Sequence, residues 1–159
     1  PPLIVDAGED RLQLRGFIDR LDRSADGRLR IIDYKTGFVE ERNLKPKSWE
    51  ELFSDTKYSQ AFQLMMYSWL YMKVHPEVKN MKAGIISLRT PRKGLMEMIP
   101  PGSGHIGPEA AAEFELHLIA LLKEIADPDL PFVQTSDPDD CRYCSFKEIC
   151  NRILPERSY

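Results

Sequence analysis

The chain has 159 residues, a hydrophobic share of 42% and a net charge of −3. This length suits one compact domain, and the slightly acidic balance is not that of a typical nucleic-acid binder, which is usually basic. No apolar run approaches the roughly 20 residues that cross a bilayer, so we expect no membrane association. The chain starts at Pro1 rather than Met, and we interpret it as part of a longer polypeptide.

The first half of the sequence predicts a hairpin followed by a loop and a helix. Strands are expected over residues 12–23 and 28–36, around SADGR, a turn with Asp-Gly at its tip. Residues 37–57 are polar and irregular, which predicts a loop with a short helical turn. Residues 58–75 have the composition and period of a helix, and Pro76 ends it.

The second half adds more strands and another helix. Strands are expected at 81–90 and 95–100, joined by a turn, and a helix over 107–126 has Pro108 near its start. The remaining tail is rich in loop residues, with a short helix expected at 145–152. Strands mixed with two long helices predict an α/β domain.

The hairpin has charged residues among its apolar ones. If Gly27 is left-handed in a three-residue loop, Asp19 lies directly opposite Asp33, and strand alternation places Lys35 on the same face as Asp33. The other face should then be apolar, formed by Leu12, Leu14, Ile18, Ile32 and Tyr34.

Two carboxylates that face each other repel, and a divalent cation between them removes that cost. Asp oxygens suit Mg²⁺, Mn²⁺ or Ca²⁺, and the backbone carbonyl of Tyr34 is a third candidate ligand. Lys35 could orient a water or stabilise charge on a phosphate. These are the parts that metal-assisted phosphodiester hydrolysis needs. The alternative is that Asp19, Asp33 and Lys35 form only a solvated face.

Four motifs, in order, resemble those of one nuclease family. They are GFIDRLD (16–22), IIDYKTG (31–37), QLMMY (63–67) and CRYCSFKEIC (141–150). The set is similar to the PD-(D/E)XK nuclease superfamily in its RecB/AddB-type branch. The cysteine spacing and the preceding PFVQTSDPDD resemble its iron–sulfur members, the AddB-like and CRISPR-associated exonuclease-like proteins.

This resemblance implies a restriction-endonuclease-like core, a mixed central sheet flanked by helices. It implies one nuclease domain over 1–159, truncated at its N-terminus, with a cysteine-containing tail at 127–159. The implied activity is that of a Mg²⁺- or Mn²⁺-dependent deoxyribonuclease of exonuclease type in DNA repair or recombination. The implied partners are DNA and a helicase subunit or domain. The alternative is a nuclease-like structural or DNA-binding module that no longer cuts.

The resemblance also assigns roles to individual residues. Asp19 and Asp33 match the metal-binding acids, and Lys35 matches the catalytic lysine. Gln63 and Tyr67 match a helix pair that supports the lysine and the DNA backbone. They are four residues apart, so one helix face presents both. The alternative for Tyr67 is that it packs in the core.

Cys141, Cys144 and Cys150 match three ligands of a [4Fe–4S] cluster. The fourth cysteine of such proteins lies upstream of this chain's motifs and is absent here, so the set is incomplete and we expect the cluster only in the full-length protein. An upstream metal-binding His is also missing, which argues against activity of this fragment alone. The alternatives are a zinc site or packing as small apolar residues. Three closely spaced cysteines favour reduced thiols in the cytoplasm.

Overall fold

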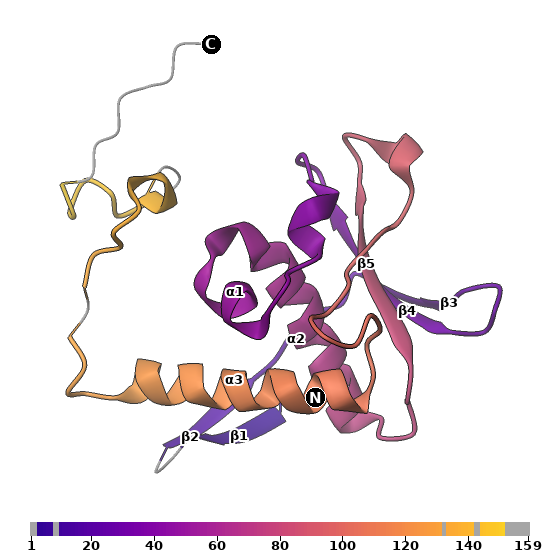
Figure 1. Cartoon of the computed structure of the whole chain (residues 1–159), viewed down its shortest axis with the longest axis horizontal. Helices are drawn as coiled ribbons and strands as arrows, with labels where there is room; N and C mark the ends of the chain where they lie inside the picture. Colours follow the sequence, from indigo (N-terminus) through magenta and orange to yellow (C-terminus); the bar gives the residue numbers. More distant parts are fainter. Residues whose placement is uncertain (1–2, 8–9, 132, 142–143, 152–159) are drawn as a thin grey trace. The chain divides into compact units, whose positions relative to one another are not determined.

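The computed structural model describes residues 3–7, 10–131, 133–141 and 144–151. The chain forms two compact units, Pro1–Ala126 and Asp127–Tyr159. The elements of the first unit, which contains the hairpin and both long helices, are traced in Figure 1.

A four-stranded mixed sheet is the centre of the first unit. Its strands are β3 (Arg20–Arg23), β4 (Leu29–Lys35), β5 (Met81–Ser87) and β6 (Met96–Glu97), in that spatial order. β4 and β5 are parallel, whereas the other two pairs are antiparallel. Parallel neighbours need a long crossover connection, and the helical segment between residues 36 and 80 supplies it. The predicted α/β fold with a mixed sheet and flanking helices is confirmed.

The predicted strand at 12–23 is wrong in one respect, because it is two strands. β2 (Asp10–Leu14) pairs with β1 (Leu3–Ala7), a strand that was not predicted, in a separate two-stranded sheet. Residues 15–19 have no strand structure, and pairing resumes in β3. Because of this break, residues 10–23 take part in two sheets: β2 pairs with β1, and β3 pairs with β4.

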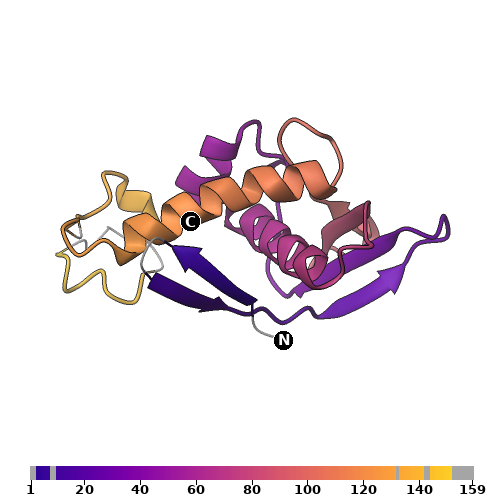
Figure 2. The same ribbon diagram turned by 90° about the horizontal axis from the view of Figure 1, so that it is seen from below.

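The helices follow the predicted order. The loop after β4 contains the 3-10 turns η1 (Glu41–Leu44) and η2 (Thr56–Tyr58) and the short helix α1 (Trp49–Ser54). The long helices are α2 (Ser59–Val74) and α3 (Pro108–Ala126). The 3-10 turn η3 (Pro91–Lys93) lies between β5 and β6. Figure 2 shows α2 and α3 on the same side of the two hairpins. No helix in the described ranges has the length and apolar character that crossing a membrane requires.

The second unit contains η4 (Pro138–Cys141) and no helix at residues 145–151. The helix predicted at 145–152 is therefore wrong over these seven residues, and residue 152 lies outside the described ranges. The backbone bonds from Lys147 to Cys144, from Cys150 to Phe146 and from Asn151 to Glu148 close separate turns. Asn151 has a φ of 53°, which a helix does not allow.

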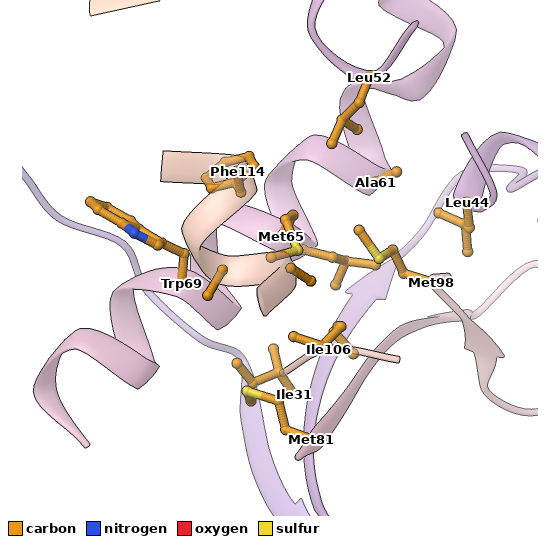
Figure 3. Close-up of a cluster of buried hydrophobic side chains, with 14 of the residues drawn as sticks. Ile31, Leu44, Leu52, Ala61, Met65, Trp69, Met81, Met98, Ile106 and Phe114 are labelled. Carbon is orange, nitrogen blue, oxygen red and sulfur yellow. The ribbon is translucent and has the colours of Figure 1, made fainter. Parts of the chain in front are cut away.

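The hydrophobic core lies between the sheet and the long helices. Figure 3 shows side chains of α2 and α3 meeting those of β4 and β5, with Trp69 near Phe114. Ile31 has no exposed surface and belongs to this core. Because side chains alternate along β4, Ile31 shares a face with Asp33 and Lys35.

The expectation that the charged face opposes the apolar face is thus wrong. The crossover places α2 over the face that carries Asp33, so the core extends under that face to the end of β4. Ile32 is buried on the reverse face, but Tyr34, also expected on an apolar face, is 37% exposed.

Candidate active site

The turn of the β3–β4 hairpin sets the position of the candidate residues. Gly27 has a φ of 82°, and Ser24 N donates to Arg28 O at 2.9 Å, as the predicted three-residue loop requires. The resulting register pairs Arg20 with Ile32. Asp19, one residue before β3, is therefore brought to the end of the ladder beside Asp33.

Asp33 and Lys35 lie at the C-terminal end of β4 and form an ion pair. Lys35 Nζ is 2.9 Å from Asp33 Oδ2. The Asp33 side chain is only 6% exposed, whereas that of Lys35 is 29% exposed. The lysine therefore reaches from a buried carboxylate towards solvent, where a substrate can approach it.

A hydrogen-bonded chain joins Lys35 to helix α2. Lys35 Nζ donates to Gln63 Oε1 at 2.8 Å, and Gln63 Nε2 donates to the Tyr67 hydroxyl at 2.7 Å. An ammonium group has only donors, so the amide oxygen must face Lys35 and the amide nitrogen must face Tyr67. The Tyr67 hydroxyl proton then remains able to donate to another acceptor.

Asp19 is exposed and binds the backbone of the same segment. Its Oδ2 accepts a hydrogen bond from Tyr34 N at 2.9 Å. This bond brings the Asp19 carboxylate to the peptide group that links Asp33 and Tyr34. The structure thus joins Asp33, Lys35, Gln63 and Tyr67 by direct contacts. Asp19, the fifth predicted catalytic residue, contacts the backbone N–H of Tyr34, which lies between Asp33 and Lys35 in the chain.

The acid pair fits a divalent cation by one further observation. Asp33 Oδ2 is buried, and within the described part of the chain it accepts no hydrogen bond of regular geometry in spite of the nearby Lys35. Lys35 Nζ, 2.9 Å away, offsets part of the cost of burying this oxygen, and a hard cation between Asp33 and Asp19 would offset more of it. The described residues hold no group of three His, Cys, Asp or Glu suited to a metal.

Asp22, the second acid of β3, forms part of an ion-pair network instead. Arg30 donates two hydrogen bonds to it, at 2.7 and 3.0 Å, and Arg20 Nη2 lies 2.7 Å from its Oδ2. The hydrogen bonds from Arg30 are the main reason that the pKa of Asp22 lies below its ordinary value. A carboxylate held between two guanidinium groups is already neutralised, so we assign Asp22 a structural role.

Asp22→Asn is expected to lower the melting temperature at pH 7 and to leave DNA cleavage unchanged. Because folding lowers the pKa of Asp22, its stabilisation is fully present above the unfolded pKa of about 3.9 and is lost as the pH falls through the folded value. Thermal melts from pH 7 to pH 3 should therefore show the difference from wild type shrink below about pH 4. A difference that grows on acidification would contradict this assignment.

Gly16 allows the segment between β2 and β3 to approach α2 closely. A Cβ atom at this position would lie 2.9 Å from two ring carbons of Tyr67 and 3.3 Å from Leu70 Cδ1. Only glycine leaves the Tyr67 ring in its present place, where its hydroxyl accepts from Gln63.

Gly16→Ala is expected to destabilise the protein by about 1–3 kcal/mol, the usual cost of overpacking. It should also reduce cleavage, because Tyr67 must move away from Gln63. Gly37→Ala is the matched control for stability, since a Cβ there would meet nothing within 4 Å. Urea unfolding and cleavage rates test both variants. Equal stability and activity of the two alanine variants would show that the contact with Tyr67 is unimportant.

A group of basic residues in the loop after β4 was not predicted from the sequence as part of a site. A hollow of about 690 Å³ is lined by side chains that include Arg42, Lys45, Lys47 and Lys57. Arg42, Lys45 and Lys57 pair with neighbouring acids, whereas no ion pair is recorded for Lys47 in the described part of the chain. The signal in the sequence was the run RNLKPK at 42–47, which a phosphate-binding surface would use.

The three cysteines are free thiols of intermediate exposure. Phe146 N lies 3.4 Å from Cys144 Sγ and donates to it. Within the described residues, which exclude 142–143, these thiols do not form a metal-binding group. The structure as described therefore does not assemble the predicted iron–sulfur ligands.

Comparison with known proteins agrees with the geometry of the site. No curated protein matches the sequence. The family model of the PD-(D/E)XK nuclease superfamily matches residues 3–151, which covers the hairpin, the long helices and most of the cysteine tail. A restriction-endonuclease-like core agrees with this match and with the mixed sheet. On this match, the chain belongs to the PD-(D/E)XK nuclease superfamily.

Proposed function

We propose that this chain is the Mg²⁺- or Mn²⁺-dependent deoxyribonuclease domain, of exonuclease type, of a DNA repair or recombination protein that works with a helicase. The observation that supports it best is the set of contacts from Asp33 through Lys35 and Gln63 to Tyr67, with Asp19 beside Asp33. Membership of the nuclease superfamily supports metal-dependent nuclease chemistry, and the cytoplasm is the compartment in which three free thiols persist.

Each residue of the set has a distinct task in this proposal. Asp19, Asp33 and the Tyr34 carbonyl hold the cation, which when bound supplies Lewis acidity to the phosphate and to water. Lys35 donates to the phosphate oxygen on which negative charge develops, or orients the attacking water. Gln63 accepts from Lys35 and so fixes its ammonium group, and Tyr67 supports Gln63 and donates its hydroxyl proton to the DNA backbone.

A basic hollow offers a second candidate contact for a polyanionic substrate. It is lined by side chains that include Arg42, Lys45, Lys47 and Lys57, from the loop that follows β4 in the chain. Cations there attract phosphates without regard to base sequence. Arg42, Lys45 and Lys57 already pair with neighbouring acids. Lys47, which has no ion pair among the described residues, is therefore the cation of this hollow that is most available to a DNA phosphate, in a chain whose net charge is −3.

The test is a cleavage assay with end-labelled DNA and the full natural polypeptide that contains these residues. Cleavage is expected with Mg²⁺ or Mn²⁺ and none with EDTA, and stepwise shortening from an end would support exonuclease action. Binding of DNA without cleavage under any divalent metal would favour an inactive nuclease-like module instead.

For the full polypeptide we also propose that Cys141, Cys144 and Cys150 provide three ligands of a [4Fe–4S] cluster with a structural role. The hydrogen bond from Phe146 N to Cys144 Sγ is a contact of the kind that the ligand sulfurs of iron–sulfur clusters accept. Anaerobic purification followed by iron and sulfide analysis tests this. A colourless, iron-free protein would rule out the cluster, and bound zinc would favour a zinc-binding module.

A further inference from the structure

An aromatic groove runs along α2 from the candidate active site. It has a volume of about 230 Å³ and is lined by α2 and its C-terminal end, from Tyr67 to His75, and by Gly16 and Ile18. Tyr67 and Tyr71 lie four residues apart on α2, so their rings share one helix face, and His75 follows directly after the last helical residue, Val74. The rings of Tyr71 and His75 stack, with centroids 4.3 Å apart and planes 26° apart.

A second hollow of about 380 Å³ begins at Tyr71, which lines both. Its cations include Arg23 and Lys79, which bond to main-chain oxygens: Arg23 Nη1 to Gly27 O at 3.1 Å and Lys79 Nζ to Pro76 O at 2.6 Å. Among the described residues neither Arg23 nor Lys79 lies within ion-pair distance of a carboxylate. Two carboxylates also line this hollow: Asp26 pairs with Arg28, and Glu77 lies 3.2 Å from His75 and interacts electrostatically with Lys79. Arg23 and Lys79 can thus still contact an external anion.

The two hollows and the candidate active site follow one another along α2. At one end, Tyr67 contacts Gln63, which contacts Lys35. At the other end, the cationic hollow follows Tyr71. α2 ends at Val74, one residue before His75, and the seven helical steps from Tyr67 to Val74 span about 10 Å. The aromatic rings thus lie between the candidate phosphate-cleaving site and the hollow that contains Arg23 and Lys79. A nucleic-acid strand presents phosphate, base and phosphate in the same order.

We propose that this groove binds an unpaired nucleobase, stacked on Tyr71 and His75, with a neighbouring phosphate on Arg23 and Lys79. The inference rests on the proposed function and adds a binding site for a single-stranded part of the substrate. Aromatic rings stack on any base, since every base has a π-face. A base held in a duplex cannot enter, because its faces are already covered by its neighbours.

The first test is the binding of a fluorescein-labelled single-stranded oligothymidylate, followed by fluorescence anisotropy in EDTA so that cleavage has no part. Tyr71→Ala in the full natural polypeptide is expected to weaken binding about 10-fold, within the range of base–aromatic stacking. Tyr71→Phe should bind as wild type does, because it keeps the ring. Leu116→Ala is the control, since Leu116 is an exposed apolar side chain on α3, 65% exposed, outside the groove. Wild-type affinity in Tyr71→Ala, or a wild-type protein that does not bind the probe, would overturn the proposal.

A second probe separates stacking from a general loss of structure. On an oligonucleotide of equal length with abasic central positions, wild type and Tyr71→Ala should bind equally weakly. An equal loss on normal, abasic and blunt duplex probes would overturn the proposal. A protein that binds through Tyr71 but never cleaves would refute the proposed function alone. A protein that cleaves and ignores Tyr71→Ala would refute the groove alone.

Discussion

Asp33→Asn is expected to lower the rate of DNA cleavage by about 10²-fold or more, the usual effect of removing a group that acts on transition-state charge. The Asp33 side chain is 6% exposed, and its Oδ2 lacks a regular hydrogen bond among the described residues. Asn has the same shape without the charge, so the cation loses a ligand while Lys35 keeps its bond to Gln63. The fold should survive, because Asn fills the same space as Asp and the bond between Lys35 and Gln63 is kept.

Melting temperatures of wild type and Asp33→Asn, each measured with and without Mn²⁺, check this result. Mn²⁺ should raise the melting temperature of wild type, because a ligand that binds only the folded state stabilises it, and it should leave that of Asp33→Asn unchanged. Asp22→Asn is the matched control, since it removes a carboxylate from the same hairpin that is already paired with two arginines. Full cleavage by Asp33→Asn would remove Asp33 from the catalytic set.

Lys35→Met is expected to reduce the cleavage rate by a similar factor of about 10² or more, for a different reason. Both acids remain, so Mn²⁺ should still bind. The substitution removes the Lys35 ammonium, which donates to Gln63 and pairs with Asp33. In the absence of metal, the buried Asp33 carboxylate then has no positive charge beside it, and this lowers the stability of the fold. The shift in melting temperature caused by Mn²⁺ should therefore be at least as large as in wild type.

Lys73→Met is the control for Lys35→Met. Lys73 is on the same helix as Gln63 but pairs with Glu115 of α3, at 2.6 Å. The Lys73→Met variant should cleave DNA at the wild-type rate. Retained activity in Lys35→Met, or loss of its response to Mn²⁺, would contradict the separate tasks given to the lysine and the acids.

The local geometry of the site could be predicted from the sequence because it depends on a tight turn. Asp26 and Gly27 specify a hairpin loop, the loop fixes the register, and strand alternation then places Asp33 and Lys35 together. The partnership of Gln63 with Lys35 spans 28 residues and was inferred from family resemblance, because no local rule connects a strand residue to a helix residue.

The remaining differences come from long-range packing. Nothing in residues 3–7 shows which strand they will join, since pairing with β2 depends on the break at 15–19. Ile31 shares a face with Asp33 because α2 crosses over that face, and periodicity alone does not say which face a crossover helix covers. The tail has helix-forming residues at 145–151, but its turns close separately.

Anomalous diffraction from crystals of the full natural polypeptide soaked in Mn²⁺ tests the proposed metal site most directly. We expect a manganese peak bound by the carboxylates of both Asp19 and Asp33, next to Lys35. Well-ordered Asp19 and Asp33 side chains with no peak between them, or manganese only at other sites, would contradict a metal-dependent active site at this end of β4.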